Sequence, residues 1–170
     1  ALPGNRSIAD LRKVTGINPD GNWQVETYYD VGNNPSKVVA TDINQDGFND
    51  VIVTNLGDGT IGVLLGLNQT ELQQQIALPV GDSPSSVAVV DFDSDGDADI
   101  VLIASDTNDE HIVQLLRSDL NLTGELIFAS AQPIDIVGVP LIVNYGDTNG
   151  DSFEDLIMIS DSSAGLRGGR

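Results

Sequence analysis

Short apolar runs separated by polar turns extend along most of the chain. Three of them, each directly after a loop rich in Asp, Asn and Gly, are residues 51–54, 100–103 and 156–159. Three more, each just before the same loops, are residues 37–41, 86–90 and 141–144. Two β-branched runs on either side of a tight polar loop are typical of a β-hairpin. Helical periodicity is nowhere sustained, so the pattern predicts an all-β chain.

Further strand-like segments flank these hairpins. One kind precedes each hairpin, at residues 23–31, 72–80 and 126–136, and another follows the first two, at residues 60–65 and 111–116. Four short strands in about fifty residues are typical of a blade of a β-propeller. We therefore expect one repeat domain, residues 1–170, with three tandem four-stranded antiparallel blades forming a partial propeller. Its expected parts are an N-terminal strand segment (1–22), repeat 1 (23–67), repeat 2 (72–119), an incomplete repeat 3 (124–163) and a flexible tail (164–170).

The N-terminal segment is informative about assembly. Residues 8–13 occupy the place of a fourth strand relative to the strand that follows them. Three blades do not close a ring, because closed propellers typically have four to eight. We expect this strand to complete a blade in cis or in a neighbouring subunit, which gives head-to-tail self-association as a ring or a filament. The competing interpretation is a piece of a longer propeller, in which residue Leu166 begins a truncated fourth strand.

The three loops share one motif. They begin at Asp42, Asp91 and Asp147, each seven residues after a proline, and each reads D-x-[DN]-x-D-[GS]-x-x-D. Ser152 stands in the third loop where the other two have a glycine.

With these loops, prolines and strand spacings, the chain resembles the VCBS and FG-GAP repeats, the blades of integrin-like β-propellers. The likeness is close over residues 61–66 and 78–96, and it extends over nearly the whole chain from about Trp23 onward. The resemblance implies that the loops bind calcium and that the domain is extracellular or on the cell surface, where such repeats serve adhesion, glycan contact or assembly.

Calcium also suits the residues themselves. It takes six to eight oxygen ligands, and short Asp and Asn side chains on a tight loop can converge on one ion. We assign side chains one, three, five and nine of each loop, together with carbonyl seven, to up to three Ca²⁺ sites. The candidate ligands are Asp42, Asn44, Asp46, Phe48 and Asp50; Asp91, Asp93, Asp95, Asp97 and Asp99; and Asp147, Asn149, Asp151, Phe153 and Asp155.

Two other interpretations of the loops are weaker. An EF-hand needs a Glu at position twelve, where this chain has Val53, Leu102 and Met158. Asp, Asn and Gly also form ordinary turns, but five matching positions in three loops are hard to explain by turn formation alone.

Composition narrows the classes of partner and chemistry. The formal net charge is −19, which opposes binding to nucleic acid or anionic lipid. No apolar stretch approaches the length that membrane insertion requires. The chain has no cysteine, which excludes disulfides and thiolate chemistry, and its one histidine, His111, leaves little for imidazole chemistry. We expect no enzymatic activity.

The remaining features concern surface ligands. Asn5, Asn68 and Asn121 begin N-glycosylation triplets. Trp23, Tyr28 and Tyr29 suit either packing between blades or stacking on a sugar. The expected function is that of a non-enzymatic, extracellular, calcium-stabilised repeat protein for adhesion or self-assembly, such as a surface or filament subunit. The alternatives are a carbohydrate-binding propeller module and a fragment of a larger propeller enzyme or adhesin.

Overall fold

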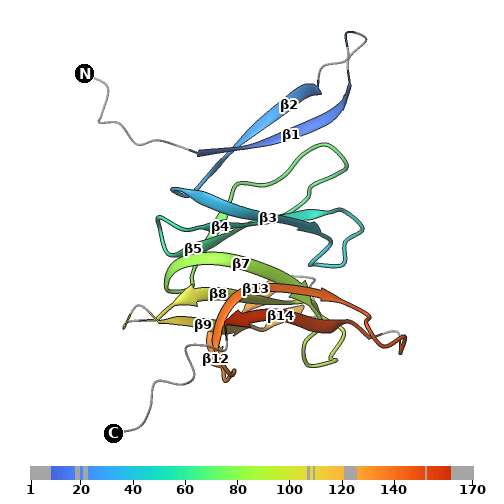
Figure 1. Cartoon of the computed structure of the whole chain (residues 1–170). Helices are drawn as coiled ribbons and strands as arrows, with labels where there is room; N and C mark the ends of the chain where they lie inside the picture. Colours follow the sequence, from blue (N-terminus) through green and yellow to red (C-terminus); the bar gives the residue numbers. More distant parts are fainter. Residues whose placement is uncertain are drawn as a thin grey trace, which may run out of the picture.

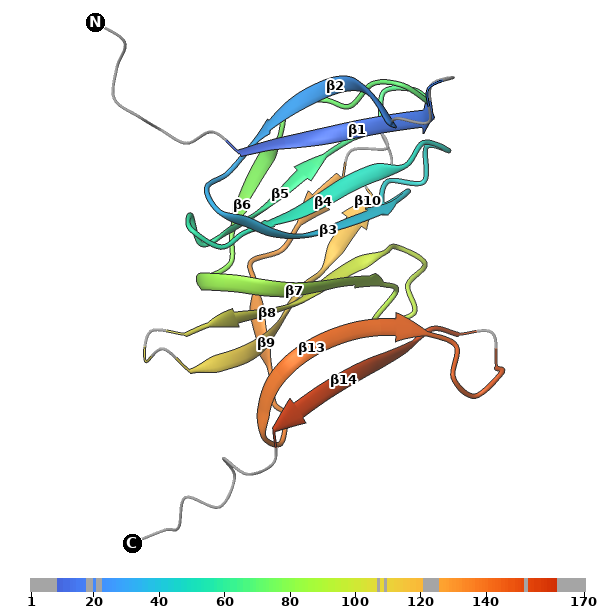
Figure 2. The ribbon, with the colours of Figure 1, turned by 45° about the horizontal axis from the view of Figure 1, so that its top comes forward.

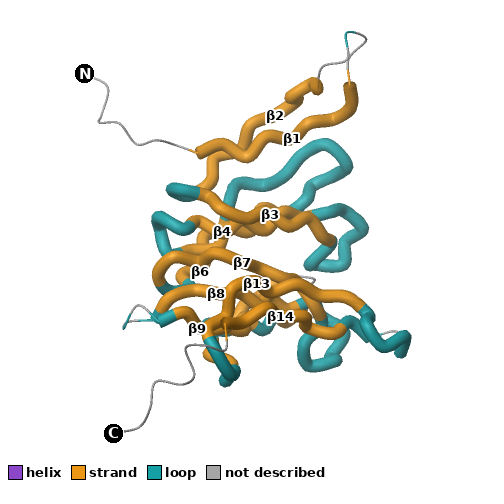
Figure 3. Tube along the Cα trace, viewed as in Figure 1, coloured by secondary structure: helices purple, strands orange, loops and turns teal. Residues whose placement is uncertain are grey.

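The computed structural model describes residues 9–17, 20, 23–106, 108, 110–120, 126–151 and 153–161, with backbone alone for 9–17 and 23–27. Every regular element in this part of the chain is a β-strand (Figure 3), so none of it is a helix long and apolar enough to cross a membrane. The strands are β1 Ala9–Ile17, β2 Trp23–Val31, β3 Pro35–Thr41, β4 Asp50–Asn55, β5 Thr60–Leu64, β6 Ile76–Pro79, β7 Asp82–Val90, β8 Asp99–Ser105, β9 His111–Leu116, β10 Ser118–Leu120, β11 Leu126–Phe128, β12 Gln132–Ile134, β13 Val139–Gly146 and β14 Asp155–Asp161.

The strands form antiparallel sheets that are stacked on one another (Figures 1 and 2). Two sheets have four strands, in the orders β3-β4-β5-β6 and β12-β9-β8-β7. Three have two strands: β1-β2, β10-β11 and β13-β14. The all-β class and the four-stranded antiparallel sheets are as predicted. The described residues form two four-stranded sheets rather than three, and they do not close into a ring.

The grouping of strands into sheets differs from the predicted one. Residues 23–31 were expected to share a sheet with the hairpin that follows, but β2 pairs with β1. The fourth strand of the first full sheet is β6, and that of the second is β12; both lie in segments that the sequence pattern assigned to the next repeat. Local pattern predicts where a strand forms, whereas its partner is set by tertiary packing.

The three acidic hairpins share an irregularity at the proline. The strand register shifts between Pro35 and Lys37 in β3, and between Pro140 and Ile142 in β13. A comparable shift spans Asp82 to Ser86 in β7, around Pro84. Proline has no N–H to give to the ladder, so the pairing is interrupted beside it. The repeated proline therefore marks where each acidic hairpin begins.

The core consists of two layers between the stacked sheets. Alternation along β7 sends Val87 and Val89 into the layer facing the first full sheet, and Ala88 and Val90 into the layer facing β13-β14. Strand β8 is buried along its whole length, because it lies in the middle of its sheet with a sheet on each face. The two layers hold the acidic hairpins side by side.

Candidate calcium loops

Each acidic loop connects the first two strands of a sheet. The flanking pairs are Thr41 with Asp50, Val90 with Asp99, and Gly146 with Asp155. The hairpins predicted at these positions are therefore present, and the loops lie at the end of the sheets where β3, β7 and β13 end.

The first aspartate organises the loop around its carboxylate. In the first loop, Asp42 accepts hydrogen bonds from the backbone N–H of Asp46 at 3.0 Å and of Gly47 at 2.9 Å. In the second loop, Asp91 accepts from the N–H groups of Asp95 and Gly96, both at 3.1 Å. Two backbone donors fix each carboxylate in place, so the loop is shaped before any cation arrives.

Backbone torsions explain the glycine of the motif. Gly47 and Gly96 have φ of 89° and 96°, a left-handed region in which a side chain is strained. The fourth loop position is also left-handed, with φ of 58° at Gln45 and 62° at Ser94, which the sequence did not indicate. In the third loop a glycine, Gly150, stands at this fourth position with φ of 81°. Ser152, the sixth position of that loop, lies outside the described residues.

The second loop gathers three carboxylates. Oxygens of Asp91, Asp93 and Asp95 lie within 4.8 Å of one another, and within the described residues this is the one cluster of three acidic or imidazole groups so close. Arg117 makes an ion pair with Asp93 at 3.4 Å. Like charges at this spacing repel, and a divalent cation among them would relieve that repulsion.

The first and third loops differ because their third residue is an asparagine. The side-chain amide of Asn44 donates to Asp46 at 2.9 Å, and that of Asn149 donates to Asp151 at 3.0 Å. Each amide therefore supplies a donor between side chains that, in the second loop, are all acceptors.

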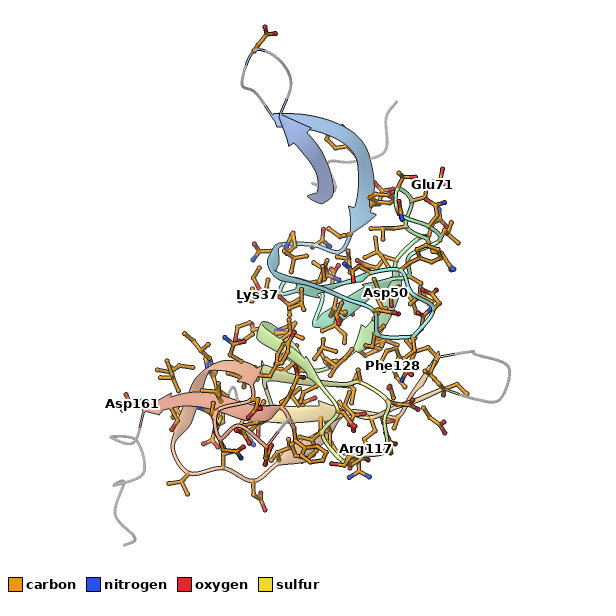
Figure 4. The ribbon with its side chains drawn as sticks, turned by 90° about the vertical axis from the view of Figure 1, so that its right-hand side faces the viewer. Lys37, Asp50, Glu71, Arg117, Phe128 and Asp161 are labelled. Carbon is orange, nitrogen blue, oxygen red and sulfur yellow. The ribbon has the colours of Figure 1, made fainter. Side chains whose placement is uncertain are left out.

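The last aspartate of the first two loops has a structural task. Asp50, whose side chain is labelled in Figure 4, is fully buried. It accepts from the N–H of Ile43 at 2.9 Å and of Gly66 at 2.7 Å. Asp99 is likewise buried and accepts from Phe92 at 3.2 Å and Ser118 at 2.8 Å. Each carboxylate thus joins the start of its loop to the residue just past the third strand of its sheet.

Burial raises the pKa of both carboxyls above its ordinary value, and the backbone hydrogen bonds oppose that rise. In the third loop, Asp155 is only partly buried and accepts from Thr148 through its N–H at 2.9 Å and through its hydroxyl. Asp50, Asp99 and Asp155 as calcium ligands stay a prediction, as do the carbonyls of Phe48, Asp97 and Phe153. The N–H groups of these last three donate to the fifth side chain of their loops, which brings position seven beside position five.

Two contacts at the loops were not predicted. Gln45 donates from its side chain to the carbonyl of Gly96 at 2.8 Å and to Asp97 at 3.2 Å, so it joins the first loop to the second. Asp97 also accepts from the N–H of Leu120 at 2.8 Å. Position four varies between loops, so the motif carries no signal for the contact made by Gln45.

Of the glycosylation candidates, one lies in the described part of the chain. Asn68 is exposed and shapes a turn by accepting from the N–H of Thr70 at 2.8 Å and of Glu71 at 3.1 Å. Its amide nitrogen, the atom that a glycan would modify, donates to Glu71 at 3.0 Å. Asn5 and Asn121 lie outside the described residues.

These features define the chain as an all-β protein of stacked antiparallel sheets with an acidic hairpin loop in each repeat. Residues 42–102 match the family model of the FG-GAP-like repeat. The match covers the first two acidic loops and the strands between them, so the predicted resemblance to FG-GAP and VCBS repeats is confirmed over this segment. No curated protein matches the chain.

Proposed function

We propose that the chain is a non-enzymatic, calcium-stabilised repeat module that acts outside the cell or on its surface, in adhesion or self-assembly. The observation that carries the calcium part is the cluster of Asp91, Asp93 and Asp95. FG-GAP-like repeats often bind calcium and are typical of extracellular proteins, which supports both the ion and the location.

The second loop fits calcium in its donor chemistry. All its candidate side-chain donors are carboxylate oxygens, which a hard cation prefers, and its backbone is already tight enough for short side chains to converge. Asp91, Asp93 and Asp95 would hold the ion, and its charge would offset their mutual repulsion. Because Asn replaces an Asp in the other two loops, and the third loop also has Ser152 in place of the glycine, we propose that occupancy falls from the second loop to the first and then to the third.

Thermal unfolding with and without calcium tests this function. Calcium that binds the folded chain but not the unfolded chain stabilises the fold by about 2.7 kcal/mol per site when free calcium is a hundredfold above the dissociation constant. The melting temperature should therefore be well above its value in chelator. The double variant Asp93→Asn/Asp95→Asn should lose the part of the response that comes from the second loop. Asp119→Asn/Asp135→Asn, which removes two exposed charges outside the loops, should keep it. Identical wild-type melts in millimolar calcium and in chelator would contradict the proposal.

A glycan-binding role is the second candidate, and one pocket favours it. A pocket of about 510 Å³ lies between the end of β2 and the segment before β6, with Tyr28, Tyr29, Asp30, Gln74 and Gln75 in its wall. Aromatic rings beside amide and carboxylate groups are suited to a sugar, which has apolar faces and many hydroxyls. The side chain of Trp23 lies outside the described part.

Glycan-array screening of the calcium-loaded chain tests this candidate. Tyr28→Ala, which removes an exposed ring from the pocket, should abolish any signal. Ile127→Ala removes a comparably exposed apolar side chain from β11, outside this pocket, and should leave the signal intact. An array without signal, or with equal signals for both variants, would leave the assembly role alone.

A further inference from the structure

The two ends of the described chain are complementary halves of one sheet. In both full sheets, the first two strands are joined by an acidic loop, as β13 and β14 are. The last two strands of the first full sheet pair Ile61 with Leu78, and β1-β2 pairs Leu11 with Tyr29. The Val31-Gly32 that follows this pairing in β2 corresponds to Val80-Gly81 after β6. Thus β13-β14 corresponds to the first half of a full sheet, and β1-β2 to the second half.

The exposed isoleucines of β13-β14 lie on the face that neighbouring repeats bury. Ile103 and Ile159 occupy the same position relative to their loops, yet Ile103 is 1% exposed and Ile159 is 56% exposed. Ile103 packs in the layer between the second full sheet and β13-β14. Ile159 pairs with Ile142, and Ile157 lies on the same outward face. In the preceding repeat, the corresponding face is covered by the next sheet.

A matching apolar gap lies at the other end of the stack. Val38 in β3 is 52% exposed, whereas Val87, its counterpart in β7, is 3% exposed. Val53, the partner of Val38 in β4, is buried, so the open part of this face lies toward β3. The hairpin β1-β2 lies on this side of the sheet (Figures 1 and 2), and its Tyr29 hydroxyl accepts a hydrogen bond from the N–H of Leu72, just before β6, at 3.0 Å. The half-sheet β1-β2 is therefore anchored near β6, and the half of the face near β3 is open.

We propose that a second copy of this chain fills both gaps by forming a composite four-stranded sheet in the order β13-β14-β1-β2, with β1 and β2 supplied by the partner. Within one chain the two half-sheets lie at opposite ends of the stack and do not meet (Figures 1 and 2). In the composite sheet, the outward isoleucines pack on the partner's Val38 as the sheets of one chain pack on each other. The proposal rests on the self-assembly part of the proposed function and specifies its interface.

The correspondence with the first full sheet also sets the register in which β14 would pair with β1 of the partner. Asn55 in β4 pairs with Thr60 in β5. Ser160 corresponds to Asn55 by its distance from the acidic loop, and Asp10 corresponds to Thr60 by its pairing next to Leu11. Ser160 of one protomer therefore lies opposite Asp10 of the next. Directly paired residues in antiparallel strands have Cα atoms about 4.5–5.5 Å apart, within the range that a disulfide bridges.

Engineered disulfides test this register without interference, because the chain has no cysteine. The variant Asp10→Cys/Ser160→Cys, oxidised in calcium, should form covalent dimers or longer ladders that reductant dissolves. The control Lys13→Cys/Ser160→Cys, offset by three residues or about 10 Å, should cross-link no more than the single-cysteine chains do. Equal cross-linking of the matched and offset variants would overturn the register and the composite sheet with it.

Light scattering of the wild-type chain gives an independent measurement. A mass that is a multiple of 17.9 kDa supports the proposal, and Val38→Asp or Ile159→Asp should reduce it to one chain while circular dichroism shows the strands intact. Ile127→Asp is the control with a comparable exposed side chain. A wild-type chain that is monomeric overturns the proposal. If this monomer assembles once residues 162–170 are deleted, those residues, and not a second copy, cover the edge of β14 in the full chain. A monomer that still melts higher in calcium refutes the interface alone, whereas cross-linking without a calcium response refutes the calcium site alone.

Discussion

The sheet β7-β8-β9-β12 and the sheet β13-β14 begin with the same kind of hairpin but differ in what surrounds them. The first has a sheet on each face and four strands, and its central strand β8 is buried throughout. The second has a packed face carrying Val143 and an outward face carrying Ile157 and Ile159. The apolar pattern is similar in both, so burial here is decided by the neighbouring sheets and not by the strands themselves. Both acidic hairpins therefore present two apolar faces, and the number of neighbouring sheets decides how many of those faces are buried.

The largest expected difference in stability is between two isoleucines at corresponding positions of the two sheets. Ile103→Ala removes a buried side chain and leaves a cavity, which should lower the free energy of unfolding by about 3 kcal/mol. Ile159→Ala, at the corresponding exposed position, should cost less than about 1 kcal/mol in dilute chain. Urea unfolding at low protein concentration measures both. Equal losses would mean that the outward face of β13-β14 is covered within a single chain.

Replacing the last aspartate of the acidic loop should destabilise the two sheets by clearly different amounts. Asp99→Ala leaves two N–H groups, those of Phe92 and Ser118, without their acceptor at a buried site, and should cost about 2 kcal/mol or more in chelator. Asp155→Ala frees the groups of Thr148, which lie in an exposed turn where water replaces the carboxylate. Its cost in the same urea experiment should be clearly smaller. A reversed order would contradict the structural task assigned to Asp99.

The third prediction concerns position three of the acidic loops, which is Asp93 in the second loop and Asn44 in the first. Asp93→Asn should weaken calcium binding about tenfold, equal to about 1.4 kcal/mol, because it removes a carboxylate and introduces an amide donor. Asn44→Asp should strengthen the first loop by a similar factor. Calorimetric titration of both variants and of Asp119→Asn, a charge control outside the loops, measures the change. If neither exchange alters affinity, carboxylate count does not set the order of the sites.

The smallest expected effect is a pH dependence in calcium-free buffer. Burial raises the pKa of Asp99 above its usual value of 3.8, so the folded chain binds the proton more tightly than the unfolded chain does. The contribution of Asp99 to the free energy of unfolding should therefore rise as pH falls through the folded pKa, and fall as pH rises through it. Urea unfolding between pH 7 and about 4 should show a weaker dependence for Asp99→Asn than for wild type. Asp155→Asn is the control, and a slope shared by all three chains would remove Asp99 as its cause.

Sequence pattern predicted the local structure well and its tertiary partners poorly. The acidic hairpins and the left-handed glycines Gly47 and Gly96 follow from short-range chemistry, because turn residues and β-branched runs act over a few positions. The assignment of β6 to the preceding sheet does not follow, since it depends on the pairing of β5 with a strand beyond a long connection. The same limit applies to Asp50, whose burial depends on Gly66 arriving from the third strand.

The candidate site divides in the same way. The residues of the second loop that lie close together were all among the predicted ligands, because they are near neighbours in the chain. Asn44 and Asn149 were predicted as ligands from their place in the motif, and the structure shows that their amide nitrogens donate to the next acidic residue of the loop. A pattern of letters does not distinguish an oxygen that faces a cation from one that accepts a backbone proton.

The strand that completes each full sheet lies in the next sequence repeat, and this affects where fragments and fusions of the protein should be bounded. Strand β6 belongs by sequence to the second repeat but completes the sheet of the first, so each sheet is closed by its successor. A fragment cut at the sequence repeat, after residue 67, would lose the strand that pairs with β5. A fragment ending after Pro79 would keep the sheet β3-β4-β5-β6 whole. Shuffled arrays built from such repeats should therefore place their junctions between β6 and β7, where no sheet is divided.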